Sequence, residues 1–450
     1  MVVRNYELEV PISEKNDALI KYDNKCISCG YCKEVCKNDV TVARMFEIKQ
    51  DMEPICINCG QCANICPTEA IKERFDYLKV KELLHNKNGK KVVMSIAPAV
   101  RTSLGEEFGA GSINVEGKVP TAMKKLGADY AFDIVYGADL TIMEEATELV
   151  KRIKDNKLLP QFTSCCPAWV KYCEIFYPEL LPNLSTAKSP IAMQGTLIKT
   201  YFSTKEDIPE NNIINIVIAP CTAKKSEINR KELNYTNKDT DFALTTREFA
   251  MLLKEENIDL LSLDDSKFDS PLGTGTGAGV IFGNTGGVCE AALRTAYYMI
   301  TGENLKKEEL VFNSIRGMKD IKEASITING REIKVAVCNG MKNAKELIDK
   351  LLKKEVYYDF IEVMNCIGGC IAGGGQSKMT LLEKDDTKLK RMKVLYDEDE
   401  QMTLRYSHEN QDIIDIYKEF LGEPNSELAE KLLHTYYTDK SYMLGGSQNE

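Results

Sequence analysis

Two closely spaced runs of cysteine near the N-terminus constrain this chain more than any other feature of its sequence. Residues 26–36 read CISCGYCKEVC and residues 56–67 read CINCGQCANICP, so each run has the spacing C-x2-C-x2-C-x3-C. Bacterial two-cluster ferredoxins hold two 4Fe-4S clusters with this spacing, and each run gives its fourth cysteine to the other cluster. The expected ligand sets are Cys26, Cys29, Cys32 and Cys66 for one cluster, and Cys56, Cys59, Cys62 and Cys36 for the other.

Zinc is the alternative metal, because C-x2-C is also a zinc-binding spacing. Two complete copies of the longer run make zinc a remote alternative. Gly30 and Gly60 lie inside the runs, where a residue without a side chain lets the backbone approach a cluster closely. A ferredoxin-like module only transfers single electrons, so the rest of the chain must show what the electrons are for.

Composition narrows the class of protein further. Sixteen cysteines in 450 residues are too many for a cytosolic protein that only packs them, and in a reducing compartment they favour metal binding. A net charge of −10 argues against a nucleic-acid partner. The N-terminus lacks the apolar segment of a signal peptide, and no apolar run approaches the about 18 residues of a membrane span. We therefore expect a cytoplasmic protein without a nucleic-acid or membrane partner.

The pattern of apolar residues predicts an α/β body behind the cysteine runs. Short apolar runs at 92–100, 128–135, 212–220 and 358–364 predict buried strands, with amphipathic helical patterns between them. This alternation is typical of mostly parallel sheets. The last sixty residues predict helices, and the charged stretch 383–393 predicts a connection before them. The expected domains are an α+β ferredoxin-like unit over 1–80, a linker over 81–91, a catalytic body over 92–382, and a helical C-terminal segment over 383–450 packed on that body.

Two other features carry no site of their own. The glycine-rich stretch 273–287 follows no predicted strand and has no phosphate-binding lysine, so it predicts a close-packed loop and not a nucleotide site. The three histidines, His85, His408 and His434, form no metal-ligand pair and predict ordinary surface or core residues. Proton chemistry must then rest on carboxylates or thiols.

Five later cysteines stand out by their surroundings: the adjacent pair Cys165 and Cys166, then Cys221, then Cys366 and Cys370. Prolines or glycines lie next to them and predict helix starts and close backbone approach. Cys166, Cys221, Cys366 and Cys370 could together hold a further 4Fe-4S cluster. The alternative is a buried structural thiol, which is the interpretation we favour for three cysteines without such surroundings: Cys173, Cys289 and Cys338.

The segments FTSCCPAW (162–169), PCTAKKSE (220–227) and NCIGGCIAGGGQ (365–376) resemble, in this order, the three signature segments of the iron-only (FeFe) hydrogenases. The resemblance covers nearly the whole chain. It implies an H-cluster, in which Cys166, Cys221, Cys366 and Cys370 bind a 4Fe-4S cubane and Cys370 also bridges to a di-iron unit with CO, CN and azadithiolate ligands. It further implies that Lys224 hydrogen-bonds a cyanide ligand. The implied pocket lining is Ala97, Pro98, Phe282 and Met364.

The implied activity is reversible oxidation of H2 to protons and electrons, with the two ferredoxin-type clusters as the electron relay. The resemblance also implies ferredoxin or flavodoxin as the electron partner, and maturation proteins that install the di-iron unit. Cys165 matches the proton-relay thiol, for which we expect a pKa near neutrality.

A helix expected over 139–154, begun by a capping box of Thr141 and Glu144, puts three side chains on one face: Glu145, Glu148 and Arg152. Their spacing alone favours a solvated, salt-bridged face. The resemblance instead assigns them, together with Ser185, to the proton path.

Several residues depart from the resemblance: Ala99, Ile191, Ala219, Asn365 and Ile367 stand where many relatives have other residues. These departures put the catalytic rate and the preferred direction of the reaction in doubt, but not the identity of the cluster ligands.

Two alternatives to a hydrogenase are a hydrogen-sensing relative and a non-catalytic Fe–S assembly protein without the di-iron unit. Cys165 argues against the first, and Lys224 with the eight-cysteine pattern argues against the second.

Overall fold

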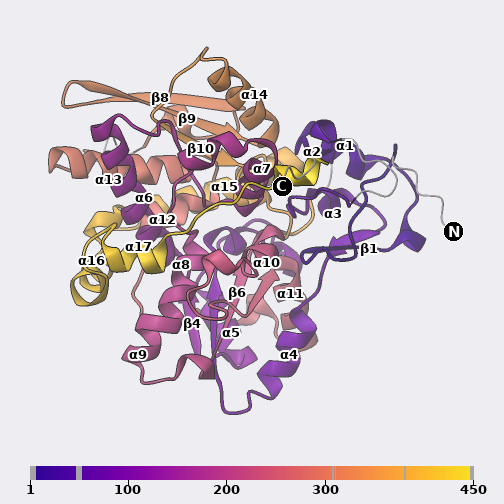
Figure 1. Cartoon of the computed structure of the whole chain (residues 1–450). Helices are drawn as coiled ribbons and strands as arrows, with labels where there is room; N and C mark the ends of the chain where they lie inside the picture. Colours follow the sequence, from indigo (N-terminus) through magenta and orange to yellow (C-terminus); the bar gives the residue numbers. More distant parts are fainter. Residues whose placement is uncertain (1–6, 47–52, 307–308, 310, 380–381, 446–450) are drawn as a thin grey trace.

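The computed structural model describes residues 7–46, 53–306, 309, 311–379 and 382–445, and it shows a small N-terminal unit beside a larger α/β body (Figure 1). Part of the N-terminus in which no signal peptide was expected, residues 1–6, lies outside this range. Within the described residues, no helix combines the length and the apolar character that crossing a membrane requires.

The N-terminal unit is built around its cysteine loops. Strand β1 (Leu19–Lys21) pairs antiparallel with β2 (Ile71–Glu73), and helices α1 (Tyr31–Asn38), α2 (Val42–Met45) and α3 (Gln61–Ile65) connect them. Helices α1 and α3 begin directly after Gly30 and Gly60, whose φ angles of 85° and 73° favour glycine. This is the expected α+β arrangement.

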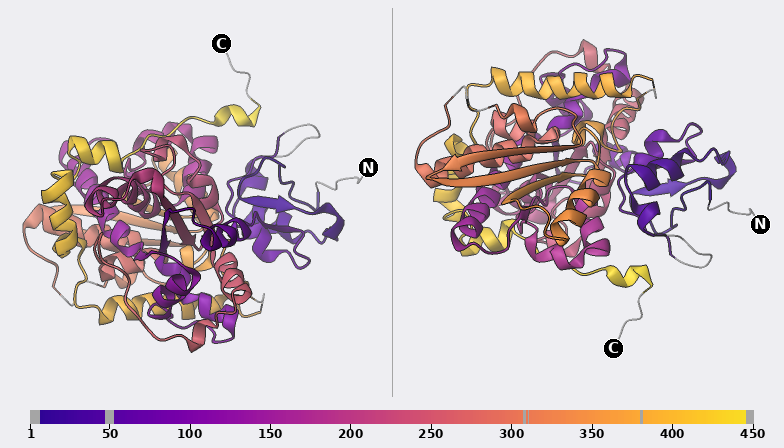
Figure 2. Two further views of the ribbon diagram at one scale, coloured as in Figure 1. Left: turned by 90° about the horizontal axis from the view of Figure 1, so that it is seen from below. Right: turned by 90° about the horizontal axis from the view of Figure 1, so that it is seen from above.

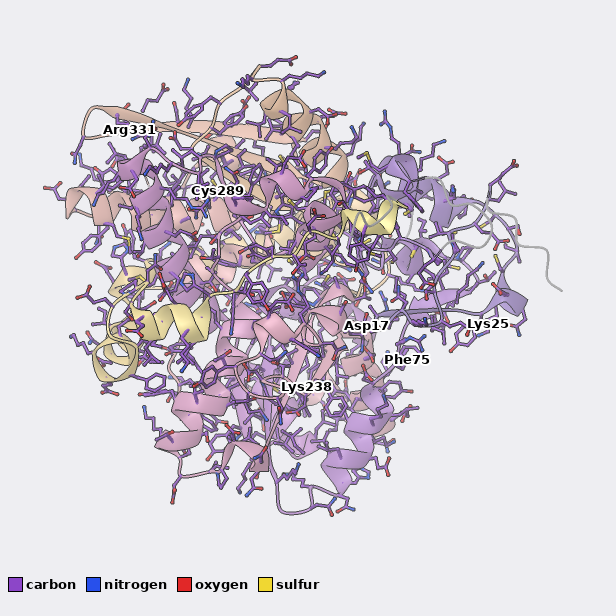
Figure 3. The ribbon with its side chains drawn as sticks, in the orientation of Figure 1. Asp17, Lys25, Phe75, Lys238, Cys289 and Arg331 are labelled. Carbon is purple, nitrogen blue, oxygen red and sulfur yellow. The ribbon has the colours of Figure 1, made fainter. Side chains whose placement is uncertain are left out.

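The body contains two four-stranded sheets. The first has the order β4-β3-β6-β7, and all its neighbours are parallel. The second has the order β5-β10-β9-β8, with β8 antiparallel to β9 and the other pairs parallel. Figure 3 places Arg331 at the outer end of the β8–β9 hairpin, away from the N-terminal unit. The strands are β3 (Lys91–Ile96), β4 (Tyr130–Asp133), β5 (Gln161–Phe162), β6 (Ile213–Ala219), β7 (Phe242–Thr245), β8 (Ile321–Ile328), β9 (Arg331–Asn339) and β10 (Phe360–Met364).

The four predicted strands are confirmed as β3, β4, β6 and β10. All seven residues of β6 are buried, because helices cover both faces of a parallel sheet. The helices of the body are α5 (Lys118–Leu126), α6 (Val135–Asp155), α7 (Pro167–Phe176), α8 (Pro190–Leu197), α9 (Ser203–Lys205), α10 (Ala223–Glu227), α11 (Thr246–Glu255), α12 (Gly277–Val280), α13 (Gly287–Thr301) and α14 (Met341–Leu352).

Helix α6 corrects one prediction. It begins at Val135 and not at a capping box, so Thr141 lies inside the helix and its hydroxyl donates to the Gly137 carbonyl at 2.9 Å. The predicted cap residue Glu144 is buried and accepts from Tyr417 instead. The local spacing was compatible with a cap, but the chain before Thr141 packs in the core and continues the helix.

The C-terminal segment is helical, as predicted, with α15 (Lys384–Gln401), α16 (Gln411–Ile416) and α17 (Glu427–Leu433). The charged stretch 383–393 is not a connection, because it forms the first half of α15; Met392 of this stretch packs beside Ala99 and Val280. Figure 2 shows α15 lying along the outside of the body. After α17 the chain returns to α7, where the Lys440 amide donates to the Glu174 carbonyl at 2.7 Å.

The two units meet across a polar junction. Helix α4 (Tyr77–His85) contributes Val80 and Leu84 to the body's core, so residues 81–85 of the expected linker are helical and 86–90 connect to β3. The Arg247 guanidinium of α11 donates to Glu73 at 2.8 and 2.9 Å, to Asn64 Oδ1 at 2.6 Å, and to the Gly374 carbonyl at 2.8 Å.

A crevice in the same junction is lined by polar side chains from both units. Asp17 and Phe75 come from the N-terminal part of the chain, and Lys238 comes from the body (Figure 3).

Candidate active site

Chain segments that leave the carboxyl ends of strands from both sheets enclose one apolar cavity. Ala97 and Pro98 follow β3, Cys165 and Cys166 follow β5, and Cys221 follows β6. The carboxyl ends of parallel strands are the usual place for a site in an α/β fold. The cavity lining contains every predicted pocket residue: Ala97, Pro98, Cys165, Cys166, Cys221, Lys224, Phe282, Met364, Cys366 and Cys370.

The four thiols assigned to a third cluster come from distant parts of the chain. Helix α7 begins at Pro167, directly behind Cys166, as predicted. Cys366 and Cys370 lie in the loop after β10, which turns at Gly369 with a φ angle of 92°. A side chain at Gly373 could not be accommodated, because its Cβ would lie 2.3 Å from the Pro220 carbonyl oxygen. The loop therefore packs directly against the segment that carries Cys221.

The donor set fits an iron–sulfur cluster. Burial raises the pKa of each of the four thiols, that of Cys366 to about 12, so thiolates here require a cationic partner. Across the described ranges, no three His, Cys, Asp or Glu side chains are arranged to hold a single metal ion. The cavity volume of about 80 Å³ exceeds the roughly 10–15 Å³ that one water needs. Soft thiolates spread around such a space suit a polynuclear iron site.

Within the described part of the chain, Lys224 on α10 is the one cationic side chain of the cavity lining. Its ammonium donates to Glu227 at 2.7 and 2.9 Å and to the Cys165 carbonyl at 3.2 Å. Burial alone lowers a lysine pKa, but the adjacent Glu227 carboxylate outweighs it, and the Lys224 pKa is raised. The site therefore keeps a permanent positive charge that can face an anionic ligand.

Cys165 lies in the same cavity, but its expected near-neutral pKa is wrong. Burial, and next the charge of nearby Glu145, raise its pKa well above the usual value for a thiol. The cavity walls exclude the water that would stabilise a thiolate. Cys165 is therefore a protonated thiol at neutral pH.

Glu145 on α6 is fully buried, and its Oε2 atom has no hydrogen-bond partner among the residues that the structure describes. Burial, and next the charge of Glu148, raise the pKa of Glu145 to about 8. An unpaired carboxyl oxygen with such a pKa can accept and release a proton near neutral pH.

The outer predicted residues meet one turn further along α6. Glu148 accepts from the Ser185 hydroxyl at 2.8 Å and from Arg152 at 2.6 Å. Arg152 also donates to the carbonyls of Asn183 at 3.1 Å and Leu184 at 2.9 Å, which holds the segment before Ser185 against the helix. The solvated face that spacing alone favoured is therefore a mostly buried contact.

Sequence reasoning missed the residues behind this contact. The Thr186 amide donates to Glu148 at 3.0 Å, and the Thr186 hydroxyl lies 2.7 Å from His434 Nδ1. His434 Nε2 lies 2.9 Å from Glu144 Oε2. His434 was expected to be an ordinary histidine, and its separation of 290 residues from Glu144 gave no local signal.

Thiols of the two N-terminal runs lie close enough to raise one another's pKa, and the assignment of each thiol to a cluster stays a prediction. Burial raises the pKa of Cys32, and the thiols close enough to contribute are Cys26, Cys66 and Cys29. Burial also raises the pKa of Cys62, with Cys56 and Cys36 as its first thiol neighbours. The thiols that contribute most to the raised pKa of Cys59 are Cys62 and, from the body, Cys366, so the second set lies against the cavity of the body.

Three family models match the chain: "Iron only hydrogenase large subunit, C-terminal domain" over residues 90–374, "Iron hydrogenase small subunit" over 385–440, and "4Fe-4S dicluster domain" over 25–71. "Iron hydrogenase 1" of Clostridium pasteurianum is 42% identical over 443 residues, covering 95% of this chain and 77% of that protein.

Two further matches differ in what their names describe. An apo [FeFe]-hydrogenase HydA1 structure from Chlamydomonas reinhardtii is similar at 37% identity and a TM-score of 0.71, covering 81% of this chain and 99% of that one. A "Cytosolic Fe-S cluster assembly factor narfl" of Danio rerio is 28% identical over 372 residues, covering 79% of this chain and 89% of that protein. The cavity, its five cysteines and the match over most of the body agree, and the chain belongs to the iron-only hydrogenase family.

Proposed function

We propose that this protein catalyses the reversible oxidation of H2 to protons and electrons at a six-iron H-cluster. The observation that carries the proposal is the gathering of five thiols and the Lys224 ammonium in one apolar cavity, with the Glu145 carboxyl beside it, whose Oε2 atom has no hydrogen-bond partner among the described residues. Cluster ligands, a cation for anionic ligands and an acid–base group are the parts that this chemistry needs.

In the proposed site, Cys166, Cys221, Cys366 and Cys370 would hold the 4Fe-4S cubane, and the Cys370 thiolate would also be the ligand shared with the di-iron unit. The di-iron unit, with its CO, CN and azadithiolate ligands, supplies the metal at which H2 is made or split. Lys224 donates to a cyanide and keeps its charge through Glu227. Ala97, Pro98, Phe282 and Met364 exclude water, which strengthens these contacts in the cavity.

The protein's own side chains move the proton. Cys165 is protonated and can donate its proton toward the interior of the cavity when a group bound there accepts it. Glu145 then returns a proton to Cys165, because its Oε2 atom is not committed to another partner. Ser185, Glu148 and Arg152 continue the path outward, with Arg152 holding Glu148 in place. General acid–base steps of this kind contribute about 10²–10⁴-fold to a rate.

In this proposal, electrons reach the cavity from the N-terminal unit. We propose that the eight N-terminal cysteines hold two 4Fe-4S clusters, one by Cys26, Cys29, Cys32 and Cys66 and one by Cys36, Cys56, Cys59 and Cys62. The first set includes exposed Cys29, and the second reaches Cys366 through Cys59. Ferredoxin or flavodoxin is the proposed electron partner, maturation proteins install the di-iron unit, and the proposed location is the cytoplasm.

The adjacent pair of cysteines provides the test. Cys166→Ala removes a cubane ligand, so pocket iron and the infrared bands of CO and CN should be lost. Cys165→Ala should keep the iron and the bands but lower H2 turnover about 10²–10⁴-fold in both directions. Cys173→Ala, a buried thiol outside the cavity, is the matched control. Near-full turnover in Cys165→Ala would contradict the proposed path.

A second candidate function is non-catalytic Fe–S cluster assembly, and the similarity to the assembly factor named above favours considering it. The two proposals differ in the di-iron unit. Matured protein with a full complement of cubane iron but without CO and CN bands, and without H2 turnover, would favour assembly. Bands that are present without turnover would favour the hydrogen-sensing alternative.

A further inference from the structure

One thiol of the cavity has hydrogen-bond donors of a different kind from the others. Cys366 Sγ accepts from the side-chain amide of Gln61 at 3.0 Å and from that of Asn365 at 3.4 Å. Cys166 and Cys221 have backbone N–H groups as their donors. Side-chain donors can be supplied or removed by single substitutions, so Cys366 is the position at which this chain can adjust the charge on a cluster ligand.

Gln61 reaches Cys366 from the other structural unit. It is the first residue of α3, between Cys59 and Cys62, and its amide also donates to the Ala372 carbonyl at 2.9 Å. Both N–H groups of the amide are therefore used at the junction. The two backbones are in direct contact there, because a Cβ on Gly374 would lie 2.1 Å from the Cys59 carbonyl oxygen. The position of Gln61 relative to Cys366 is fixed by this packing.

Asn365 points to the same sulfur from the body. Its side chain is buried, its Nδ2 faces Cys366, and its Oδ1 has no hydrogen-bond partner. A buried amide oxygen without a partner costs free energy. The reverse orientation would turn the oxygen toward the sulfur, which accepts hydrogen bonds and does not donate them once it is a thiolate. The observed orientation therefore favours donation to Cys366.

We propose that Gln61 and Asn365 raise the reduction potential of the cubane that Cys366 ligates, and that Gln61 makes this increase depend on the docked N-terminal unit. The proposal rests on the proposed function for the identity of the cluster. In the step concerned, one electron leaves the second N-terminal cluster and reduces the pocket cubane, and no proton moves. Reduction makes the thiolate sulfur more negative, so N–H donors stabilise the reduced form more than the oxidised form.

Gln61 is therefore a positioning residue for electron transfer and not a catalytic residue. It touches the ligand sulfur, and it lies beside both Cys59 and Cys62 of the adjacent set. The same amide thus makes the pocket cubane a better electron acceptor and ties it to the cluster that supplies the electron. A body without its N-terminal unit would lose this donor and hold a cubane of lower potential.

The test uses full-length matured protein and a redox titration followed by the infrared bands of the di-iron unit, which report on the attached cubane. Gln61→Leu should lower the midpoint. At the wild-type midpoint, the ratio of reduced to oxidised cubane should fall roughly tenfold, which is about 59 mV for a one-electron couple. Asn365→Leu should give a smaller shift in the same direction, because its donor is further from the sulfur.

Gln61→Glu provides a variant of the same shape, in case the leucine variant fails to assemble. A carboxylate cannot donate to the sulfur and adds negative charge, so the midpoint should fall at least as far. Asn64→Leu is the matched control. Asn64 crosses the same junction, but its amide donates at 3.2 Å to the Gly373 carbonyl and not to a sulfur, so the midpoint should not change.

Two outcomes overturn the proposal: an unchanged midpoint in both Gln61 variants with intact iron and bands, or an equal shift in Asn64→Leu. The second would mean that junction packing, and not donation to the sulfur, sets the potential. Wild-type protein without infrared bands after maturation would instead overturn the proposed function, so the two failures are distinguishable.

Discussion

The cysteines of the N-terminal unit and those of the body reach their positions in opposite ways. The first eight lie within residues 26–66, in the helices α1 and α3 and in the loops beside them, and Cys29 is exposed. The pocket thiols come from residues 165–370 and lie where strands of two buried sheets end. The small unit has a correspondingly small apolar core, formed by Val10, Ile12, Ala18, Leu19, Cys62, Ala63 and Ile71. We therefore expect the small unit to depend on bound clusters for its folding, and the larger core of the body to form without its cluster.

Removing the iron should separate the two regions most clearly. Metal sites that organise a small fold contribute their binding free energy to folding, so the iron-free N-terminal unit should unfold. Amides of α1 and α3 should lose protection against hydrogen–deuterium exchange by about 10³-fold or more, while amides of β3 and β6 keep theirs. Equal loss of protection in both regions would show that the pocket is also formed around its metal.

The carboxylates of α6 belong to the body alone, and Glu145→Gln tests them. H2 turnover should fall about 10²–10⁴-fold, because the amide cannot exchange a proton with Cys165. The cluster bands should remain, since Glu145 is not a ligand in the proposed site. Glu148→Gln serves for comparison and should have a smaller effect, because Glu148 is further from the cavity and already bonded to Arg152 and Ser185.

Glu145 also predicts a pH dependence. Its pKa rises from 4.5 to about 8 on folding, so the folded protein holds this proton more tightly than the unfolded chain. The stability from this group is complete below about pH 4.5 and is lost as the pH rises through about 8. The acid C=O stretching band of Glu145, taken as wild type minus Glu145→Gln, should disappear over the upper part of this range. A band that is already absent at pH 6 would contradict the raised pKa.

Arg247 tests how firmly the two regions are joined. Arg247→Leu leaves Glu73 buried without its cation, and breaking a buried ion pair in this way costs about 3–5 kcal/mol. Turnover driven by a protein electron donor should fall, by about tenfold if the junction stays closed in only about a tenth of the molecules. Turnover driven by a small dye that reaches the body should change less. Lys254→Leu, on the same helix but exposed, is the control. Equal losses with both donors would place the defect in the pocket.

The departures around the pocket should have the smallest effect. Ile191 lines the cavity, whereas Ala219 lies beneath it and does not reach the lining. Ile191→Gln adds a donor near the di-iron ligands, so the ratio of H2 oxidation to production should change by a few-fold, and Ala219→Met should change it less. A larger change in Ala219→Met would mean that packing under the cavity matters more than the lining.

Local patterns explain which parts of this fold could be predicted. In the runs around Gly30 and Gly60, a few neighbouring residues determine the local backbone geometry. Strand β6 is buried throughout because both faces of its sheet are covered. The start of α6 could not be predicted, because Thr141 and Glu144 have the spacing of a cap, while tertiary packing extends the helix back to Val135. In such cases, the burial of side chains in the folded protein outweighs the local conformational propensity of the sequence.

The distinction between local patterns and tertiary packing also applies to the residues of the site. The signature segments led to Cys166, Cys221 and Lys224 through a resemblance, and spacing alone left a structural role open for the cysteines. His434 and Thr186 had no local signal, because their contacts with Glu144 and Glu148 depend on the returning C-terminal segment. The pKa of Cys165 was predicted wrongly because burial is a property of the folded cavity and not of the sequence around the thiol.

That returning segment has a consequence for how the protein is made. Tyr437 donates to the Ser185 carbonyl across 252 residues, and the Thr435 amide donates to the Thr186 carbonyl. At a synthesis rate of about 5–20 residues per second, the ribosome adds Tyr437 about 13–50 s after Ser185. Throughout that interval the nascent chain carries Cys165 and Cys166 without its closing contacts. Cys165 and Cys166 are thus made well before the contacts that close the neighbouring segment 185–186 can form, and we expect the growing chain to require a reducing environment until Tyr437 has been added.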